Sequence, residues 1–425
     1  MNRRGILILV ALMCGLVILK LATSRREPIA DGKPISYWLE NLGDFDSDEP
    51  NAAAMALQKI GTNALPWMLR EIRREKSKTK QWLEDQLEKQ SLIKFKFENQ
   101  DEHRGHAEIA FEILGPTAAP AIPDLMQLLE AVEVNSEVEE ALAYIGAASV
   151  PRLIGALTNA DTYLRENAAD TLGRMGPDAD SAVPPLLQCL HDPSADVRVS
   201  AAQALGGIRR VPEQAVPALV AALQDSERNV RFHAVYALGC FEDEAEIAVG
   251  PLLRLVSDRE ADVREQAAST LGQIARNSEE VVPILLSNLT NADASLRATI
   301  IWSLDSFPDK ADDIVPVLMK EAENASPRAS SAAFSSLGKL RSKPEDVVPF
   351  LVSRLEDPVP YVRFDAAIAL GEFRDTSEQT ILALTRLQGD KTMVFRGSCM
   401  GSVPVGDAAR IALRAIQSDQ TSPSR

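Results

Sequence analysis

The sequence predicts an all-α protein built as a right-handed α-solenoid of stacked helix pairs. The first observation is a repeat, because Asp192, Asp225 and Asp258 stand 33 residues apart and each is followed six residues later by an arginine. The second is length: 425 residues exceed the roughly 250–300 at which one hydrophobic core stops growing, whereas a repeat array can continue. The third is composition, since Ala and Leu dominate and aromatic residues make up only 5%, which is typical of helices.

Residues 1–26 are predicted to be a signal anchor. A basic start at 1–4 precedes an uncharged stretch at 5–19, and the apolar run continues past Lys20, which is near the lower end of the ~17–25 residues that span a bilayer. A cleaved signal peptide and a lipoprotein acylated at Cys14 are the alternatives. Short basic starts normally stay in the cytoplasm, so we expect a membrane-anchored protein with an extracytoplasmic repeat domain, on the periplasmic side in a bacterium.

Three segments are predicted between this leader and the regular repeats. Residues 27–50 form a polar linker that carries a short docking helix. A degenerate N-terminal repeat follows at 51–75, and a charged insertion at 76–104 departs from the repeat pattern.

The solenoid itself is predicted over residues 105–416. Its repeat register is interrupted by a second insertion at 389–404. Residues 417–425 are expected to be a disordered tail, because they are polar and have no helical periodicity.

Each repeat is predicted to consist of two helices. The first opens near a proline such as Pro184, because the first turn of a helix tolerates proline. The second is introduced by the recurrent Asp or Asn, which is a turn and capping residue. Its apolar residues Val197, Ala201, Leu205 and Ile208 are spaced for one helical face, so neighbouring pairs can share a core.

Two motifs recur in these repeats: Val-Arg-x-x-Ala-Ala-x-x-Leu-Gly, and Val-Pro-x-Leu-Leu before it. They resemble the HEAT repeat, specifically the short HEAT-like type named after phycobilin lyase subunits, over about residues 105–416. The start Gly32-Lys-Pro-Ile-Ser-Tyr-Trp-Leu39 followed by such repeats is similar to membrane-anchored or secreted bacterial HEAT-repeat proteins. The resemblance implies an interaction scaffold, and its few enzymatic relatives include bilin lyases and a di-iron hydroxylase.

The charge balance excludes one class of partner. The formal net charge is −16, and a chain this acidic repels phosphate backbones, so nucleic acid is not expected as a ligand. A protein partner with positive charge fits better. Outside the leader there are three cysteines, Cys189, Cys240 and Cys399, with no CxxC pair, so disulfide stapling is not indicated.

No catalytic residue, metal site or cofactor is predicted. The four histidines, His103, His106, His191 and His233, include no His-Glu dipeptide, which the di-iron relatives would require as paired ligands. His103 and His106 lie one helical turn apart, but no third ligand accompanies them. There is also no Gly-rich phosphate loop and no nucleophile motif. We therefore expect no enzymatic activity, with a lyase-like activity left open.

The evenly spaced charged residues are predicted to form a structural ladder. One interpretation of the arginines is a row that binds carboxylate or phosphate ligands. The favoured interpretation is that each arginine bonds the Asp, Asn or loop carbonyls of its own and the adjacent repeat, since a frame stays constant while a binding groove varies between repeats. The ladder comprises Arg165, Arg198, Arg231, Arg264, Arg297, Arg363, Asp192, Asp225, Asp258 and Asp357.

Partner-binding residues are predicted where the repeats differ. At 100° per residue, the positions equivalent to 199 and 203 point away from the core face of the second helix, and apolar or aromatic pairs occupy them in alternate repeats. Anchors two repeats apart would be separated by roughly 20 Å, a spacing suited to an extended peptide or a helix. The alternative is that these rings pack on neighbouring helices or on the second insertion. The predicted set is Phe232, Tyr236, Trp302, Phe364 and Ile368.

Taken together, these features predict a monomeric, membrane-tethered, non-enzymatic scaffold that binds a polypeptide along one face of the solenoid. Apolar anchoring would give affinity, and the acidic surroundings would select a partner with some positive charge. The alternatives are an accessory or lyase-like subunit of an enzyme complex, and a binder of carbohydrate or another envelope polymer.

Overall fold

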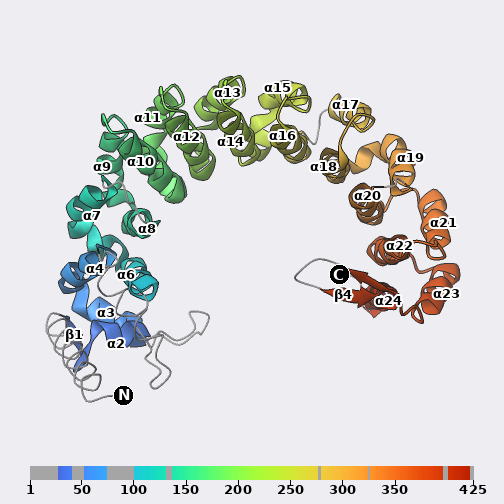
Figure 1. Cartoon of the computed structure of the whole chain (residues 1–425), viewed down its shortest axis with the longest axis horizontal. Helices are drawn as coiled ribbons and strands as arrows, with labels where there is room; N and C mark the ends of the chain where they lie inside the picture. Colours follow the sequence, from blue (N-terminus) through green and yellow to red (C-terminus); the bar gives the residue numbers. More distant parts are fainter. Residues whose placement is uncertain are drawn as a thin grey trace, which may run out of the picture. The chain divides into compact units, whose positions relative to one another are not determined.

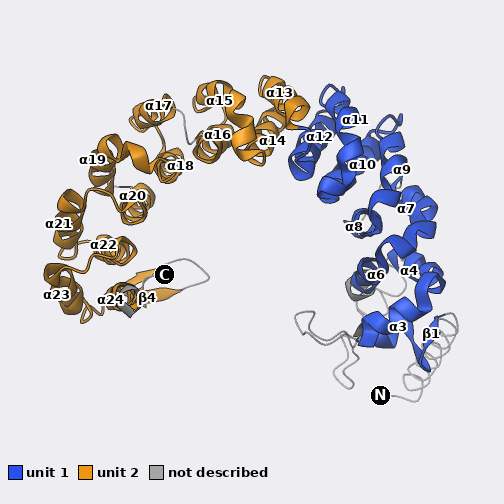
Figure 2. Ribbon diagram, turned by 180° about the vertical axis from the view of Figure 1, so that it is seen from behind, with its two compact units in different colours: residues 1–211 blue, residues 212–425 orange. Residues whose placement is uncertain are grey.

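The computed structural model describes residues 27–40, 52–73, 100–130, 136–275, 279–323, 326–395 and 401–421, which are mainly helical (Figure 1). Contacts divide the chain into two compact units, Met1–Val211 and Pro212–Arg425 (Figure 2). The predicted signal anchor, the second half of the linker and most of the first insertion lie outside the described residues. Within the described residues, no helix has both the length and the apolar character needed to cross a membrane.

The first unit begins with a short hairpin and continues as helices. The hairpin pairs β1 (Ile29–Ala30) with β2 (Lys33–Pro34). The helices are α2 (Ile35–Glu40), α3 (Ala52–Ile60), α4 (Leu65–Ile72), α6 (Gln100–Leu114), α7 (Ile122–Leu129), α8 (Ser136–Ile145), α9 (Val150–Ala156), α10 (Thr162–Arg174), α11 (Val183–Cys189) and α12 (Ala195–Ile208). Short 3₁₀ segments, η1 (Gly61–Ala64), η2 (Gly115–Ala121), η3 (Gly146–Ala148) and η4 (Gly176–Ala182), connect several of them.

The second unit continues the helix pairs. Its helices are α13 (Pro212–Ala222), α14 (Arg228–Gly239), α15 (Val249–Leu255), α16 (Ala261–Ile274), α17 (Val281–Asn288), α18 (Ala294–Leu304), α19 (Ala311–Ala322), α20 (Pro327–Leu340), α21 (Pro344–Arg354), α22 (Pro360–Phe373), α23 (Glu378–Leu387) and α24 (Val405–Thr421). The 3₁₀ segments η5 (Glu242–Ala248) and η6 (Pro308–Lys310) precede α15 and α19.

The start of the first unit contains a hairpin that was not predicted from the sequence. Asp31 and Gly32 form its turn, and both have a positive φ, of 49° and 77°, which is the conformation that an Asp-Gly hairpin turn requires. The short helix α2 follows directly. Its Ile35 and Leu39 are buried, and α2 packs on α3, so α2 docks on the first helix pair.

The second insertion and the tail also have defined structure. Strands β3 (Met393–Phe395) and β4 (Ser402–Pro404) pair as an antiparallel hairpin, with Val394 opposite Val403. The last helix, α24, ends at Thr421, further along the chain than the predicted end at Ile416. The first part of the expected disordered tail is therefore helical.

The helices of each unit form two layers (Figure 1). In the second unit, α14, α16, α18, α20, α22 and α24 pack one on the next, and α15, α17, α19, α21 and α23 do the same. We call the first set the second-helix layer, because each member is the second helix of its pair. In the first unit, α6, α8, α10 and α12 form the corresponding layer.

The core lies between the layers. Val197, Ala201, Leu205 and Ile208 on α12 are buried, as predicted. Burying side chains of this kind stabilises the fold by roughly 1.5–3 kcal/mol for each large aliphatic residue. Neighbouring pairs contribute equivalent residues, so the core is continuous along each unit.

The start of the first helix differs between repeats. In α9 and α11 the recurrent proline stands in the first turn, as expected. In α13 and α21 the helix begins earlier, and Pro217 and Pro349 lie inside it. The reason is an additional proline, Pro212 or Pro344, which starts the helix and leaves the recurrent proline in the interior, where it removes one backbone hydrogen bond.

The second helices approach so closely that glycine is required at the contact. A Cβ atom on Gly173 of α10 would lie 2.7 Å from Cα of Ala204 on α12, and one on Gly371 of α22 would lie 2.7 Å from Cα of Ala412 on α24. Both contacts are with backbone, which cannot move aside without shifting a helix. The recurrent glycine therefore sets the spacing between repeats.

We expect Gly173→Ala to destabilise the first unit, because overpacking of this kind costs about 1–3 kcal/mol. Thermal unfolding followed by circular dichroism measures the effect, with a shift of about 2–4 °C for each kcal/mol. The matched control is Gly155→Ala in α9, where a Cβ meets nothing within 4 Å. That change should raise the melting temperature slightly, since alanine is favoured over glycine in helices by up to ~1 kcal/mol. Equal melting temperatures for the two variants would contradict the close-contact explanation.

Candidate partner-binding face

The second-helix layer of the second unit leaves only a narrow strip of each helix open. α16 packs against both α14 and α18, and α18 against both α16 and α20, while the core side of each helix is covered by the first helices. Beyond the first turn of each helix, the only exposed residue is Tyr236 on α14 and Trp302 on α18. A partner that approaches these helices therefore meets these two rings.

Tyr236 and Trp302 are 53% and 44% exposed. Neighbouring helix axes lie ~8–10 Å apart, so with α16 between them the two rings are separated by about 20 Å. Arg328, at the start of α20, places its Cζ atom 6.0 Å from the centroid of the Trp302 ring, within the range of a cation–π contact. Exposed aromatic side chains of this kind are typical of protein-binding surfaces.

The prediction that Phe364 is an open anchor is wrong. Phe364 is only 9% exposed, and Phe232 and Ile368 are half-buried. The helix α22 packs against α20, α24 and β3, and these neighbours restrict the surface that helical geometry alone would leave free. Phe232 also meets the ring of His233 edge to face, with 5.1 Å between centroids. The five predicted residues therefore reduce to Tyr236 and Trp302 as open rings.

Two exposed tyrosines of the helix pairs were missing from the predicted set. Tyr361 in the first turn of α22 is 41% exposed, and Tyr163 in the first turn of α10 is 57% exposed. The hydroxyl of Tyr361 donates to the carbonyl oxygen of Phe395 on β3, at 3.3 Å. The two tyrosines occupy the same repeat position, whereas the predicted residues came only from the two positions opposite the core face.

The second-helix layer of the first unit carries a line of carboxylates. Glu108 on α6 shares a hydrogen bond with Glu140 on α8, which together with burial and the charges of Glu140, Glu137 and Glu112 raises the pKa of Glu108 to about 7. On α10, burial raises the pKa of Glu166. Acid groups crowded in this way favour a nearby positive charge.

One arginine partly balances this line. Nε of Arg174 lies 2.9 Å from Oε2 of Glu139, and its Nη1 lies 3.5 Å from Oε1 of Glu140. Burial still raises the pKa of Glu139 against the lowering effect of Arg174. On α10, burial likewise raises the pKa of Asp170. The acidic character of this surface is therefore reduced but not cancelled.

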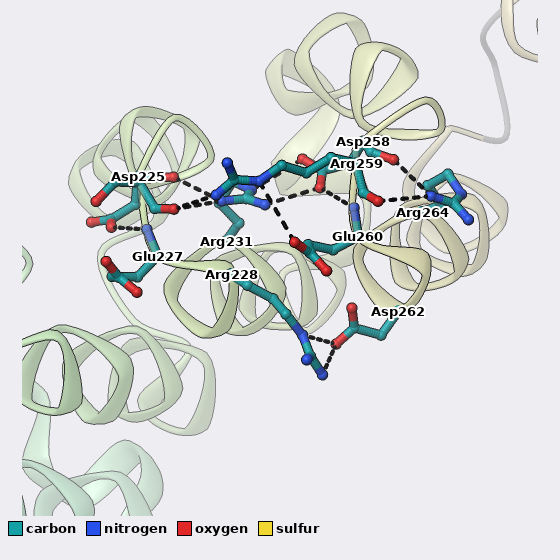
Figure 3. Close-up of polar contacts among 10 residues, drawn as sticks. Asp225, Glu227, Arg228, Arg231, Asp258, Arg259, Glu260, Asp262 and Arg264 are labelled. Atoms are coloured by element: carbon teal, nitrogen blue, oxygen red, sulfur yellow. Dashed lines mark hydrogen bonds and ion pairs between the residues drawn. The ribbon is translucent and has the colours of Figure 1, made fainter.

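The ladder residues connect the loops of successive repeats, as Arg231 and Asp258 show (Figure 3). Nε and Nη2 of Arg231 donate to the two carboxylate oxygens of Asp258, at 3.0 and 2.9 Å. Its Nη1 donates to the carbonyl oxygens of Asp225 and Ser226, at 3.1 and 3.0 Å. The side chains of Arg231 and Asp258 are only 6% and 10% exposed. One guanidinium thus ties the loop of its own repeat to the loop of the next.

The pairing of an arginine with the aspartate 27 residues later recurs in both units. In the first unit, Nε and Nη2 of Arg165 donate to the two oxygens of Asp192, at 2.8 and 2.9 Å. In the second, Nε of Arg363 donates to Oδ2 of Asp390 at 2.9 Å, and its Nη1 donates to the carbonyl oxygen of Asp357 at 2.8 Å. The pair of Arg165 and Asp192 is bidentate, which combines charge with a fixed orientation, whereas Arg363 meets Asp390 through Oδ2.

Where the acceptor is not aspartate, the arginine finds another carboxylate. Arg264 would meet Asn291 by the repeat spacing, and its Nη2 lies instead 3.6 Å from Oδ2 of Asp293. Nη1 of Arg297 lies 3.4 Å from Oε2 of Glu321. Both keep bonds to their own loop, as Arg264 does to the carbonyl oxygen of Asp258 at 2.9 Å. Arg198 binds its own loop in the same way, through the carbonyl oxygen of Asp192 at 2.9 Å.

The recurrent aspartates stabilise the turn before the second helix rather than capping the helix itself. Oδ1 of Asp192 accepts the N–H of Ser194 at 2.8 Å, and Ser194 is the N-cap residue of α12. Burial raises the pKa of the Asp192 carboxyl, but the hydrogen bonds from Arg165 and Ser194 outweigh it and hold the pKa below its usual value. The pKa of Asp258 is lowered by the corresponding balance, with Arg231 as the main donor.

Among the described residues there is no group of three or more His, Cys, Asp or Glu side chains that could hold a metal ion. Cys189 is buried and Cys240 half-buried, and neither of these two forms a disulfide. Cys399 and the side chain of His103 lie outside what the structure describes.

Comparison with protein families identifies the repeats. Residues 183–249, 245–305, 282–371 and 315–398 match the family model of HEAT repeats, and residues 164–192 match that of the PBS lyase HEAT-like repeat. No curated protein matches the sequence.

Solved structures share the fold at low sequence identity. Importin beta, in an ammonium sulfate condition, aligns with a TM-score of 0.55 and 16% identity over 92% of this chain and 56% of its own. The Kap95:Nup1 complex gives 0.52 and 12% over 90% and 53%. The CpcE–CpcF complex of phycocyanin lyase from Nostoc sp. PCC7120 gives only 0.31, with 19% identity over 62% and 92%. The chain therefore spans about half the length of the importin beta and Kap95 chains.

These structural likenesses concern the fold alone. The sequence matches go further, because the HEAT-repeat model covers residues 183–398, which is about half of the chain. The stacked helix pairs in the structure agree with it. The chain belongs to the HEAT-repeat family.

Proposed function

We propose that this protein is a non-enzymatic interaction scaffold that binds a polypeptide partner along the second-helix layer of its second unit. The observation that carries the proposal is the isolation of Tyr236 and Trp302, the only exposed residues of α14 and α18 beyond their first turns. The apolar surface of an exposed aromatic ring is in contact with water, which is unfavourable. A partner that covers the ring removes this contact and gains binding free energy. Two such rings in register suit apolar side chains of an extended segment or a helix.

The partner is expected to carry some positive charge. The chain has a formal net charge of −16, which steers a basic partner toward it at a rate that falls with added salt. In the first unit, the acidic line of Glu108, Glu140, Glu166 and Asp170 offers contacts for lysine or arginine side chains. These charged contacts concern the first unit alone and are independent of the two rings.

We also propose that residues 1–26 tether the protein to a membrane, with the repeats on the extracytoplasmic side. The support is the apolar run of the sequence, which lies outside the described residues. Removal of residues 1–26 should move the protein from the carbonate-washed membrane fraction to the soluble fraction. Recovery of the intact chain in the soluble fraction would instead refute the anchor.

An accessory subunit of an enzyme complex is the second candidate function. The match of residues 164–192 to the PBS lyase HEAT-like repeat favours it. A chromophore that co-purifies with the protein, or one that it converts, would support this candidate against the scaffold.

The double variant Tyr236→Ala, Trp302→Ala should lose its partner. Truncation of a central aromatic anchor costs about 2 kcal/mol or more in typical interfaces, so affinity should fall about 30-fold for one ring and roughly 1,000-fold for both if the two losses add. Detergent extraction, affinity capture and mass spectrometry identify the partner of the wild type, and the affinity for the purified partner is then compared between variants.

The matched control for this experiment is Tyr163→Ala, which removes an equally exposed ring from the first unit. It should leave the affinity unchanged. Undiminished binding by the double variant, with normal helicity, would contradict the proposed face. Binding of a glycan in place of a protein would favour the carbohydrate alternative.

The protonation of Glu108 is expected to depend on pH near neutrality. Its pKa is raised from 4.5 to about 7, so the folded state binds a proton more tightly than the unfolded state. This contribution to stability is complete below pH 4.5 and is lost as the pH rises through about 7. Because Glu108 is only partly buried, screening should limit the effect to about 1 kcal/mol, or a melting-temperature loss of about 2–4 °C.

The variant Glu140→Gln should reduce this loss, since it removes the main source of the raised pKa. Melting temperatures between pH 4.5 and pH 8 measure stability, and carboxyl ¹³C shifts report the Glu108 titration itself. The control is Glu130→Gln, which changes an exposed glutamate after α7. If Glu108 titrates near pH 4.5 in the wild type, the proposed effect of Glu140 on Glu108 is refuted.

A basic peptide that binds the first unit should do so more tightly above pH 7 than at pH 6.

A further inference from the structure

The ladder of the second unit contains one aspartate whose arginine is missing. In the pairs Arg231–Asp258 and Arg363–Asp390, the donor precedes the acceptor by 27 residues. The same offset counted back from Asp357 leads to Ser330. A serine side chain carries no charge and is too short to bridge two repeats.

The local contacts show that neither residue replaces the missing pair. Ser330 is buried, and its hydroxyl donates to the carbonyl oxygen of Ala322 at 2.7 Å. Oδ1 of Asp357 accepts the N–H of Val359 at 2.8 Å, as in the complete turns. Its Oδ2 lies 3.7 Å from Nη1 of Arg354, beyond the 2.9 Å that separates Nη2 of Arg231 from Asp258.

A cavity opens at this position of the ladder. Its volume is about 290 Å³, slightly below the ~300–1,000 Å³ of pockets that take drug-sized ligands. The cavity is therefore large enough to hold the head group of one side chain. Its walls come from the end of α19, from α20, α21 and α22, and from the loop between α21 and α22. The lining includes Glu323, Ser330, Arg354, Asp357, Tyr361 and Asp365.

Arg354 lines this cavity without taking the ladder position. Its Nη2 lies 3.0 Å from Oε1 of Glu323, and its Cζ lies 5.1 Å from the centroid of the Phe350 ring. Its Nε atom is buried and has no hydrogen-bond partner among the described residues. Arg354 is therefore held toward Glu323 and Phe350, and it supplies one positive charge beside the three carboxyl groups of the lining.

We propose that the cavity beside Asp357 binds the guanidinium of an arginine side chain from a protein partner, which completes the ladder from outside the chain. The complete positions of this same protein provide the template, since Asp258 and Asp192 each bind a guanidinium through both carboxylate oxygens. Tyr361, which is 41% exposed, places an aromatic ring in the lining, a surface on which guanidinium groups stack. This inference names a chemical feature of the partner and so rests on the proposed scaffold function.

Arginine is favoured over lysine for a geometric reason. A guanidinium offers two parallel N–H donors that match a carboxylate, whereas an ammonium group is a single point of charge. Oδ1 of Asp357 already accepts a hydrogen bond within its turn. Oδ1 of Asp258 does the same, from the N–H of Glu260, and Asp258 still forms the bidentate pair with Arg231. The same arrangement is therefore open at Asp357.

The test uses the full-length protein and capped amino acids as probes. N-acetyl-arginine methylamide, its lysine analogue and its citrulline analogue are titrated and followed by saturation-transfer NMR. We expect saturable binding of the arginine probe, binding of the lysine probe at least tenfold weaker, and no binding of the isosteric but neutral citrulline probe. Asp357→Asn should weaken binding of the arginine probe at least tenfold.

Ser330→Arg provides the sharpest variant, because it places the protein's own guanidinium at the 27-residue offset. It should abolish binding of the arginine probe and raise the melting temperature of the protein. Equal binding of the arginine and citrulline probes, or full binding by Ser330→Arg with normal helicity, would overturn the inference. If Ser330→Arg does not fold, Asp357→Asn decides the outcome by itself.

The two proposals fail separately. Tyr236→Ala, Trp302→Ala should keep its binding of the arginine probe while it loses the partner. A wild type that binds its partner through these rings but does not bind the arginine probe would remove the cavity proposal alone. A wild type that binds the probe but whose partner affinity ignores the two rings would remove the proposed face alone.

Discussion

A helix pair of this protein cannot bury its apolar face by itself, and close stacking of each pair on the next provides the missing cover. The glycines of the second helices make this stacking possible. At Gly173 and Gly371 a single added methyl group would collide with the backbone of the neighbouring helix. Because packed interiors tolerate few voids and little overlap, these contacts fix the distance between repeats and so the positions of all groups that the repeats carry.

The same stacking decides which side chains a partner can reach. Each second helix has its core side covered by the first helices and its flanks covered by neighbouring second helices. Only one line of positions stays open, and Tyr236 and Trp302 occupy it on α14 and α18. Phe364, on the flank of α22, is covered. Exposure on this surface is thus set by the neighbour as much as by the helix to which a residue belongs.

The loops are held by a different interaction, the bidentate pairs of the ladder. Each guanidinium satisfies loop carbonyl oxygens of its own repeat and a carboxylate of the next, so buried polar groups keep partners. The side chains of such a pair are mostly buried, and removal of one partner leaves a costly unpaired group. Asp357 is the place in the second unit where the sequence itself has removed the donor, and the cavity beside it follows from that loss.

The amino-acid sequence was sufficient to predict the repeat, the helix pairs, the buried face of Val197 and Leu205, and the positions of the ladder residues, because all of these follow from local periodicity and a constant spacing. The Asp31-Gly32 turn of the first hairpin also has a local signal, although it was not among the predicted elements. Three features needed the folded chain: Phe364 is covered while Tyr236 is open, the hydrogen bond with Glu140 raises the pKa of Glu108, and a cavity lies beside Asp357. The physical reason is that burial, coupled charge and free volume depend on which side chains of neighbouring helices come together, and the distance and rotation between those helices are set by packing along the whole unit.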